Sequence, residues 1–232
     1  MGYIVIDCET SGLFRHHNIV NGEKVTARSD EPGQPRMAQY AHVLLDDNFN
    51  VEAEYSQYVQ PVGWQNEDGS PMLEMPQGAF EVHGLTMDFL RVNGNSVHHA
   101  LDRYVAAIMA GRILIGFHQQ HDGRQIRAEL RHAGRDDLFE RTPNICAMRS
   151  ITANYKGEDG KCAVKKLNRK GGHPRLIDAA AHFGISYPEE DRHDGMRDAR
   201  VTAKVAERLH EMGLLLPAEV HYSRNMPQGE QS

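Results

Sequence analysis

Two acidic residues interrupt an apolar run near the start of the chain, in the stretch IVIDCETSGL at 4–13. Asp7 and Glu9 are two positions apart, so in a strand they project from one face, about 7 Å apart along the backbone. The simplest relief for two like charges at that spacing is a bound cation, and carboxylate oxygens favour Mg²⁺ or Mn²⁺. The pair therefore indicates a metal site, although a solvated strand end could carry the same residues.

Two further acids occupy positions from which they could join this pair. Asp122 follows the apolar stretch RILIGFH and stands at the start of an amphipathic helix. Asp198 begins an apolar stripe with helical spacing, so its side chain is expected to face inward. Each alone has a simpler interpretation, such as an acid in the first helical turn. Together with Asp7 and Glu9 they favour convergence on one edge of a sheet, where open α/β sheets place ligands.

A histidine stands five positions before the last of these acids. His193 precedes Asp198 in a stretch that contains Gly195, so it can swing over the same site. The spacing itself is uninformative, because four other His-Asp pairs in the chain share it. Only this pair combines a histidine in a glycine-containing stretch with an acid that opens an amphipathic helix. We therefore select His193 as the candidate base among the 14 histidines.

The four carboxylates could hold two divalent ions about 3.5–4 Å apart, which clamp the attacking and leaving oxygens of a phosphoryl displacement. Phosphodiester hydrolysis is the reaction that this arrangement favours. A histidine with an ordinary pKa of about 6.5 can take the proton from the attacking water near neutral pH. The predicted metal ligands are Asp7, Glu9, Asp122 and Asp198, and the predicted general base is His193.

The elements that must position these residues alternate between strands and helices. We expect an α/β fold with a mixed sheet flanked by helices in a single domain. Strands are expected at 3–8, 37–45, 52–62, 112–118 and 144–148. Helices are expected before Gly84 and at 96–111, 122–133, 174–184 and 197–212, with loops at 14–36 and 151–175. The expected domain is 1–214, and 215–232 is expected to be a partly disordered tail.

Three segments resemble the motifs of the DEDDh 3′-5′ exonucleases, the family that includes the proofreading exonuclease subunit of bacterial replicative DNA polymerase. They are VIDCETSGL, ILIGFHQQHDGRQI and HDGMRDA, and the segments EVHGLT and LIDAAAHFGI also resemble family segments. The resemblance covers roughly 3–212 and implies a ribonuclease H-like fold. It also implies 3′ to 5′ removal of single nucleotides, with two divalent metal ions, Mg²⁺ or Mn²⁺, as cofactors.

The resemblance also implies where the terminal nucleotide binds. Thr10 and Leu13 occupy positions that usually contact it, and His83 lies in a segment that usually lines its pocket. The middle motif departs from the family pattern, because His118 replaces an asparagine and His121 an aromatic residue; we expect His118 to contact substrate. The long stretch 14–36 either shapes the substrate channel or is a tolerated surface insertion, and we favour the second.

Composition and charge limit the remaining functions. The net charge of −6 excludes long-range attraction for nucleic acid, so binding must be local. One dense basic stretch, 161–175, could be a solvated surface or a phosphate-contacting patch. Three cysteines without a C-x-x-C pair argue against disulfides and a Cys-based zinc site. With no signal peptide and no apolar run near ~20 residues, we expect a cytoplasmic protein without a membrane role.

Several functional alternatives stay open at this point. The substrate is expected to be the 3′ end of single-stranded or frayed nucleic acid, and the sequence leaves DNA and RNA both open, so an RNA-directed exonuclease of the same family is the first alternative. A non-catalytic subunit of a polymerase or repair complex is a second alternative, and a phosphohydrolase acting on nucleotides is a third. The sequence has no room for a polymerase domain within 232 residues, so proofreading would require a separate protein. The oligomeric state is not predicted.

Overall fold

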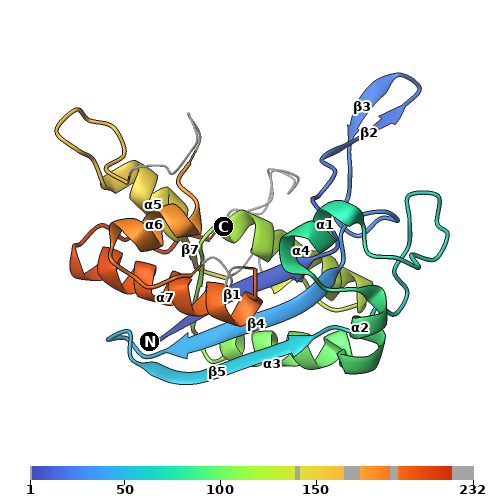
Figure 1. Ribbon diagram of the computed structural model, residues 1–232, viewed down its shortest axis with the longest axis horizontal. Coiled ribbons are helices and arrows are strands. Elements are labelled where there is room, and N and C mark those ends of the chain that lie inside the picture. The colour runs from blue at the N-terminus through green and yellow to red at the C-terminus, as the bar shows by residue number, and fades with distance from the viewer. Residues whose placement is uncertain (1, 139–141, 165–172, 189–192, 221–232) are drawn as a thin grey trace, which may run out of the picture.

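The central sheet of the protein has five strands in the order β5-β4-β1-β6-β7 (Figure 1). The computed structural model describes residues 2–138, 142–164, 173–188 and 193–220. The strands of this sheet are β1 (Tyr3–Thr10), β4 (Met37–Leu45), β5 (Val51–Tyr58), β6 (Ile113–Gly116) and β7 (Asn144–Cys146). β4 pairs antiparallel with β1 and β5, whereas β6 pairs parallel with β1 and β7. The predicted mixed sheet in a single α/β domain is confirmed.

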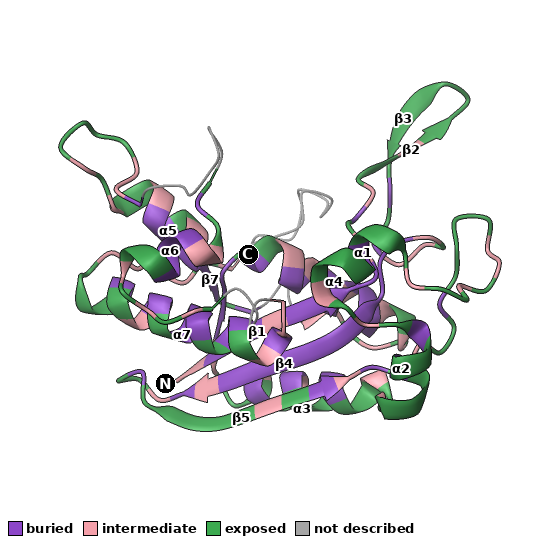
Figure 2. Ribbon diagram, viewed as in Figure 1, coloured by how far each residue is buried: buried purple, intermediate pink, exposed green. Residues whose placement is uncertain are grey.

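Helices cover both faces of this sheet. They are α1 (Gln77–His83), α2 (Met87–Asn93), α3 (Val97–Met109), α4 (Gln119–His132), α5 (Ala147–Asn154), α6 (Leu176–His182) and α7 (Gly195–Glu211). One face of β1 packs Ile4 and Ile6 against α3 and α4, and the other packs Val5 against α7. β1 is apolar on both pleat faces because it is buried on both, as its sequence predicted (Figure 2). None of the described helices is long and apolar enough to cross a membrane.

The expectation that 14–36 is a loop is wrong. The segment contains a two-stranded hairpin, β2 (His17–Val20) and β3 (Glu23–Thr26), which projects from the body (Figure 1). Asn21 and Gly22 form its turn with φ of 52° and 83°. An Asn-Gly pair adopts two successive positive φ angles easily and favours a tight hairpin turn. That local signal predicts the hairpin even though its strands are short and exposed.

Other boundaries differ by amounts that matter for the site. α4 begins at Gln119 and α7 at Gly195, each earlier than predicted, so both Asp122 and Asp198 lie in the first turns of their helices. α2 and α5 occupy segments in which no helix was predicted, and β7 is shorter than the predicted strand. β5 ends at Tyr58 rather than 62, before the turn in which the Val62 N–H bonds the Gln60 carbonyl.

The end of the described chain packs against the same domain. Leu216 N–H donates to Ser150 Oγ at 3.0 Å, and Glu219 pairs with Asn144 beside β7. Residues 215–220 of the expected tail therefore continue along the body. The rest of that expected tail, and the middle of the basic stretch 161–175, lie outside the described residues.

Candidate active site

β1 supplies two acids from one face, as their spacing predicted. Cys8 points into the core with Ile4 and Ile6. Asp7 and Glu9 therefore lie on the opposite face, which α7 covers. Glu9 is buried and Asp7 is partly exposed. The rigid, fully covered strand thus presents both carboxylates near its C-terminal end.

α4 brings the third acid to the same strand. β6 ends at Gly116, where an added Cβ would lie 2.9 Å from the Gln119 Cα, so a side chain there would push α4 away from the sheet. The close approach lets Asp122 reach β1, where its Oδ1 accepts a hydrogen bond from the Cys8 N–H at 3.2 Å. The carboxylate of Asp122 is buried beside the two acids of β1.

The start of α7 supplies Asp198 and follows His193. Asp194 caps the helix, since its side chain accepts from the Arg197 N–H at 3.1 Å. Gln39 of β4 holds the same turn: its Oε1 accepts from the Gly195 N–H at 3.0 Å and its Nε2 donates to Asp194 Oδ2 at 3.3 Å. The helix start is therefore hydrogen-bonded to β4, the strand next to β1.

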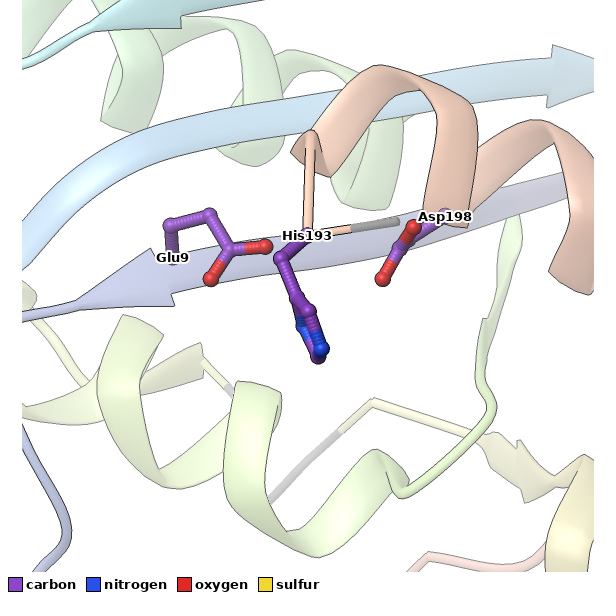
Figure 3. Close-up of side chains that lie close together, drawn as sticks. All are labelled: Glu9, His193 and Asp198. Atoms are coloured by element: carbon purple, nitrogen blue, oxygen red, sulfur yellow. The ribbon is translucent and has the colours of Figure 1, made fainter. Parts of the chain in front are cut away.

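The tightest group of possible metal ligands is Glu9, His193 and Asp198. One ligand atom from each lies within 4.8 Å of the others. Figure 3 shows the His193 ring between the two carboxylates. His193 has a φ of 61°, which is unusual for a non-glycine residue and is typical of functional positions held by their surroundings. Asp7 and Asp122 are not in this tight group, but they line the same cavity.

The carboxylates raise one another's proton affinity. Burial, followed by the charges of Asp122 and Asp198, raises the pKa of Asp7 well above its usual value. The same causes, burial and then Asp198 and Asp122, raise the pKa of Glu9 to about 8. Burial raises the pKa of Asp122 to about 7, despite the hydrogen bond from Cys8. Such a cluster is stabilised by protons or by cations.

A cavity of about 630 Å³ opens beside these acids. The predicted substrate residues Thr10, Leu13, His83 and His118 all line it, as do His193 and the four acids. Leu13 is 86% exposed, so its apolar side chain lines the cavity in contact with solvent. The structure therefore brings every predicted site residue to one cavity. The roles assigned to these residues stay predictions.

The contacts of His83 fix its tautomer. Its Nδ1 accepts from the Leu85 N–H at 3.0 Å, so Nε2 carries the proton and donates to the Thr10 carbonyl at 3.1 Å. Both ring nitrogens are therefore occupied within the protein, and burial lowers the pKa of this histidine. His83 can offer a nucleotide its ring face but no free nitrogen.

Some residues of the site were not selected from the sequence. Gln39 and Tyr187 act through other side chains: the Tyr187 hydroxyl donates to Asp198 Oδ1 at 2.5 Å. No sequence pattern connects these two residues, one on a strand and one in a loop, with the acidic residues that they contact. His121 also lines the cavity, and its replacement of the usual aromatic residue was the available clue. The other unselected lining residues are Cys8, Gly12, Pro76, Gly78, Ala79, Val82, Phe117 and Leu176.

Comparison with known protein families agrees with this geometry. The family RNase_T, described as exonuclease, matches residues 4–206. The chain belongs to this exonuclease family. The match confirms the resemblance to exonucleases of the DEDD type, whereas the narrower likeness to the polymerase proofreading subunit stays a prediction. None of the curated proteins gave a significant sequence match.

Solved structures of other exonucleases share the fold of this family member. E. coli exonuclease I in complex with a 5cy-dA13 oligonucleotide has a TM-score of 0.64 and 19% identity, over 90% of this chain and 40% of that one. A product-bound exonuclease I has a TM-score of 0.66 and 18% identity, and the match covers 92% of this chain and 44% of that one. The zinc-bound E. coli ExoI-ssDNA complex has a TM-score of 0.61 and 17% identity, over 90% and 40%. The chain thus spans less than half the length of these proteins, and the likeness confirms the expected fold.

Proposed function

We propose that this protein is a metal-dependent 3′-5′ exonuclease that releases nucleoside monophosphates from single-stranded or frayed ends. The observation that carries the proposal is the meeting of four carboxylates and one histidine in one cavity of an exonuclease-family domain. These groups come from β1, α4 and the start of α7, which are far apart in the sequence. Nothing in the packing of a soluble core calls for four acids at one place.

The donor set suits hard divalent cations. All four acids offer oxygen ligands, and burial and the neighbouring carboxylates raise the pKa values of Asp7 and Glu9, so a bound cation would stabilise their charged forms. Asp7, Glu9, Asp122 and Asp198 would hold two ions, and Mg²⁺ or Mn²⁺ fits their chemistry. When bound, such ions supply positive charge at the scissile phosphate and acidify the attacking water.

His193 would act as the general base, taking the proton of the attacking water. Its ring lies between Glu9 and Asp198, within reach of a water held by those carboxylates. The Tyr187 hydroxyl orients the Asp198 carboxylate through its hydrogen bond. Gln39 anchors the helix start that follows His193, and this anchor would help to hold the ring near the carboxylates before substrate binds.

The remaining cavity residues would hold the terminal nucleotide. Leu13 offers an exposed apolar edge to a base, His83 offers its ring face, and Thr10 forms the floor between them. His118 stands on the α4 side of the same cavity. A cavity of about 630 Å³ is of the size that binds a small ligand. This size suits binding of one terminal nucleotide rather than of a long stretch of strand.

Single-stranded DNA is the substrate that we favour. The similar exonuclease I structures contain single-stranded oligonucleotides such as the 5cy-dA13 strand. The net charge of −6 is compatible with this substrate, because metal ions and a local pocket replace a basic surface. RNA ends present the same phosphodiester chemistry and are the alternative. A polymerase or repair-complex partner remains a prediction from the family resemblance.

Digestion of 3′-terminally matched DNA and RNA strands labelled at the 5′ end tests the proposal. We expect stepwise shortening from the 3′ end with Mg²⁺ or Mn²⁺, loss of activity in EDTA, and protection by a blocked 3′ end. The Asp7→Ala variant should be inactive under all conditions. Full activity in EDTA or in Asp7→Ala would exclude the metal mechanism. Absence of any cleavage by the wild type would favour the non-catalytic alternative, and cleavage of nucleoside triphosphates alone would favour a nucleotide phosphohydrolase.

A further inference from the structure

Aromatic and cationic side chains continue the cavity wall of α4 away from the carboxylates. His121 lines the cavity, and the Phe14 ring meets it edge-on with 6.0 Å between ring centroids. The Arg124 guanidinium lies over the Phe14 ring, with its Cζ 4.5 Å from the ring centroid. We call Phe14, His121 and Arg124 the Phe14 shelf. Phe14 follows Leu13 in the chain and its ring contacts His121, so the shelf adjoins the cavity that Leu13 and His121 line.

Arg124 has hydrogen-bonding capacity that the described part of the chain does not use. One terminal nitrogen donates to His16 Nδ1 at 2.6 Å, and the other makes a long contact of 3.4 Å with the Ala27 carbonyl. No described carboxylate pairs with it. The next arginines of α4 differ, since Arg127 and Arg131 both contact Asp137. A guanidinium has five N–H donors in a planar fork, and this one is only partly buried.

The surroundings of Arg124 favour an anion. Burial, followed by the charges of Arg127 and Arg131, lowers the pKa of Arg124, so an anion beside the guanidinium would stabilise its charged form. The Phe14 ring supports one face of the guanidinium, which leaves its outer face and edge for a ligand. Phosphates and stacked bases are the partners that such supported arginines bind in nucleic acids.

The 14–36 insertion fixes the shelf in place. Gln34, near the end of the insertion, is almost fully buried. Its Oε1 accepts a hydrogen bond from the Arg15 N–H, and its Nε2 donates to the Arg15 and Arg28 carbonyls, all at 2.8–3.0 Å. These bonds tie Arg15 to the rest of the insertion, while Phe14 and His16 contact His121 and Arg124 of α4. A rigid platform loses little conformational entropy when a flexible strand binds to it.

We propose that the Phe14 shelf binds the phosphodiester group on the 5′ side of the scissile one, with Arg124 as the phosphate ligand. The inference rests on the proposed exonuclease function and names a second subsite for the same strand. It gives the insertion a role in substrate binding rather than that of a tolerated surface excursion. DNA and RNA share the phosphodiester, so the shelf alone does not select between them.

Binding in EDTA tests the shelf without relying on catalysis. We expect Arg124→Gln to weaken binding of a fluorescently labelled thymidine decanucleotide about tenfold, measured by anisotropy. The slope of log K against log salt should fall by about 0.7, the value for one phosphate contact on a single strand. Arg127→Gln removes the same charge from a neighbouring, already paired position and should change binding less than twofold. A uridine decanucleotide run in parallel shows whether RNA shares the effect.

A substrate pair locates the contact on the strand. The p-nitrophenyl ester of thymidine 5′-monophosphate has no nucleotide on the 5′ side, whereas a thymidine trinucleotide does. Arg124→Gln should lower kcat/KM on the trinucleotide about tenfold more than on the ester. Arg124→Lys keeps the charge and should retain the salt slope, which keeps the test valid if Arg124→Gln folds poorly.

Several outcomes would overturn the shelf. They are equal losses on the two substrates, unchanged decanucleotide binding by Arg124→Gln, or an equal effect of Arg127→Gln. If the wild type cleaves neither substrate but Arg124→Gln still weakens binding with the expected salt slope, the proposed exonuclease function fails and the shelf stands as a nucleic-acid site. If the wild type cleaves both and Arg124→Gln behaves as wild type, the function stands and the shelf fails.

Discussion

At the residue scale, the two histidines His83 and His193 of the site differ in their contacts. His83 has both ring nitrogens hydrogen-bonded, so it can shape a pocket but has no nitrogen left for proton transfer. His193 instead lies beside Glu9 and Asp198 at the cavity. The sequence could single out His193 only from its context. It could not show that His83 is occupied, because that depends on contacts with two backbone groups.

Replacing the proposed base should affect turnover more than metal affinity. We expect His193→Ala to lower kcat about 100-fold or more, because the attacking water would lose its proton acceptor. Single-turnover cleavage measures the loss, and calorimetric titration with Mn²⁺ measures metal binding. His17→Ala, an exposed hairpin residue, is the matched histidine control. A large loss of Mn²⁺ affinity with turnover restored at saturating Mn²⁺ would instead make His193 a metal ligand.

The hydroxyl of Tyr187 should tune the metal site through Asp198. Tyr187→Phe removes the donor to Asp198 Oδ1, leaving the carboxylate less well oriented. Loss of such a supporting hydrogen bond typically costs about 10–100-fold in metal affinity or activity, so the Mg²⁺ concentration for half-maximal activity should rise. Tyr155→Phe removes a hydroxyl that contacts His182 away from the carboxylates, and it should leave that concentration unchanged. An unchanged Mg²⁺ dependence in Tyr187→Phe would contradict this role.

At the element scale, position in the sheet decides which parts of the sequence are predictable. β1 has a continuous apolar run because it is buried on both faces, and α7 has a helical apolar period because it is buried on one. The β2–β3 hairpin lacks such a pattern, since its strands are exposed and its only signal is the Asn21-Gly22 turn. The start of α7 also escaped prediction, because Gln39 holds it from a strand more than 150 positions away.

Gln39 should act as a positioning residue for the start of α7. Gln39→Leu removes the acceptor of the Gly195 N–H and the donor to Asp194. Leaving a buried N–H without a partner costs about 1–3 kcal/mol of unfolding free energy, and the loosened turn should move His193 and Asp198. We expect a lower melting temperature together with a large loss of kcat.

A second buried glutamine separates this role from general destabilisation. Gln57 of β5 donates to the Ser96 carbonyl at 3.0 Å, at the start of α3, and has no hydrogen bond with Asp194 or Gly195 among the described residues. Gln57→Leu should lower the melting temperature to a similar extent and keep kcat close to that of the wild type. Equal kcat losses in the two variants, compared at a temperature where both are folded, would assign Gln39 a purely structural role.

At the scale of the whole molecule, the stability of the metal-free protein should depend on pH through the acid cluster. Glu9 has a pKa of about 8 and Asp122 of about 7 in the folded state, both far above the usual values of carboxyl groups. Between those usual values and the folded ones, the folded protein binds more protons than the unfolded chain. The free energy of unfolding therefore decreases as pH rises through 7 and 8.

Buried histidine acts in the opposite direction at lower pH and defines the useful range. Burial lowers the pKa of His42 to about 4, so its stabilising contribution is complete above pH ~6.5 and is lost as the pH falls from there to about 4. Measurements above pH ~6.5 isolate the carboxylates from this effect. In EDTA the melting temperature should fall between that pH and about pH 8.5. The corresponding loss of unfolding free energy is up to about 1.4 kcal/mol per pH unit for each proton that the folded state retains.

Divalent metal should reverse this slope, because a cation replaces the protons that hold the acids together. Ligand binding to the folded state alone stabilises by RT ln(1 + [L]/Kd), and deprotonated carboxylates bind Mg²⁺ more tightly. The gain in melting temperature from Mg²⁺ should therefore be larger at pH 8 than at pH 6.5. Asp122→Asn removes one of the interacting charges, so its stability in EDTA should depend less on pH. A melting temperature in EDTA that rises or stays constant across this range would contradict mutual repulsion of the four acids, and with it the electrostatic argument for a metal centre at the end of β1.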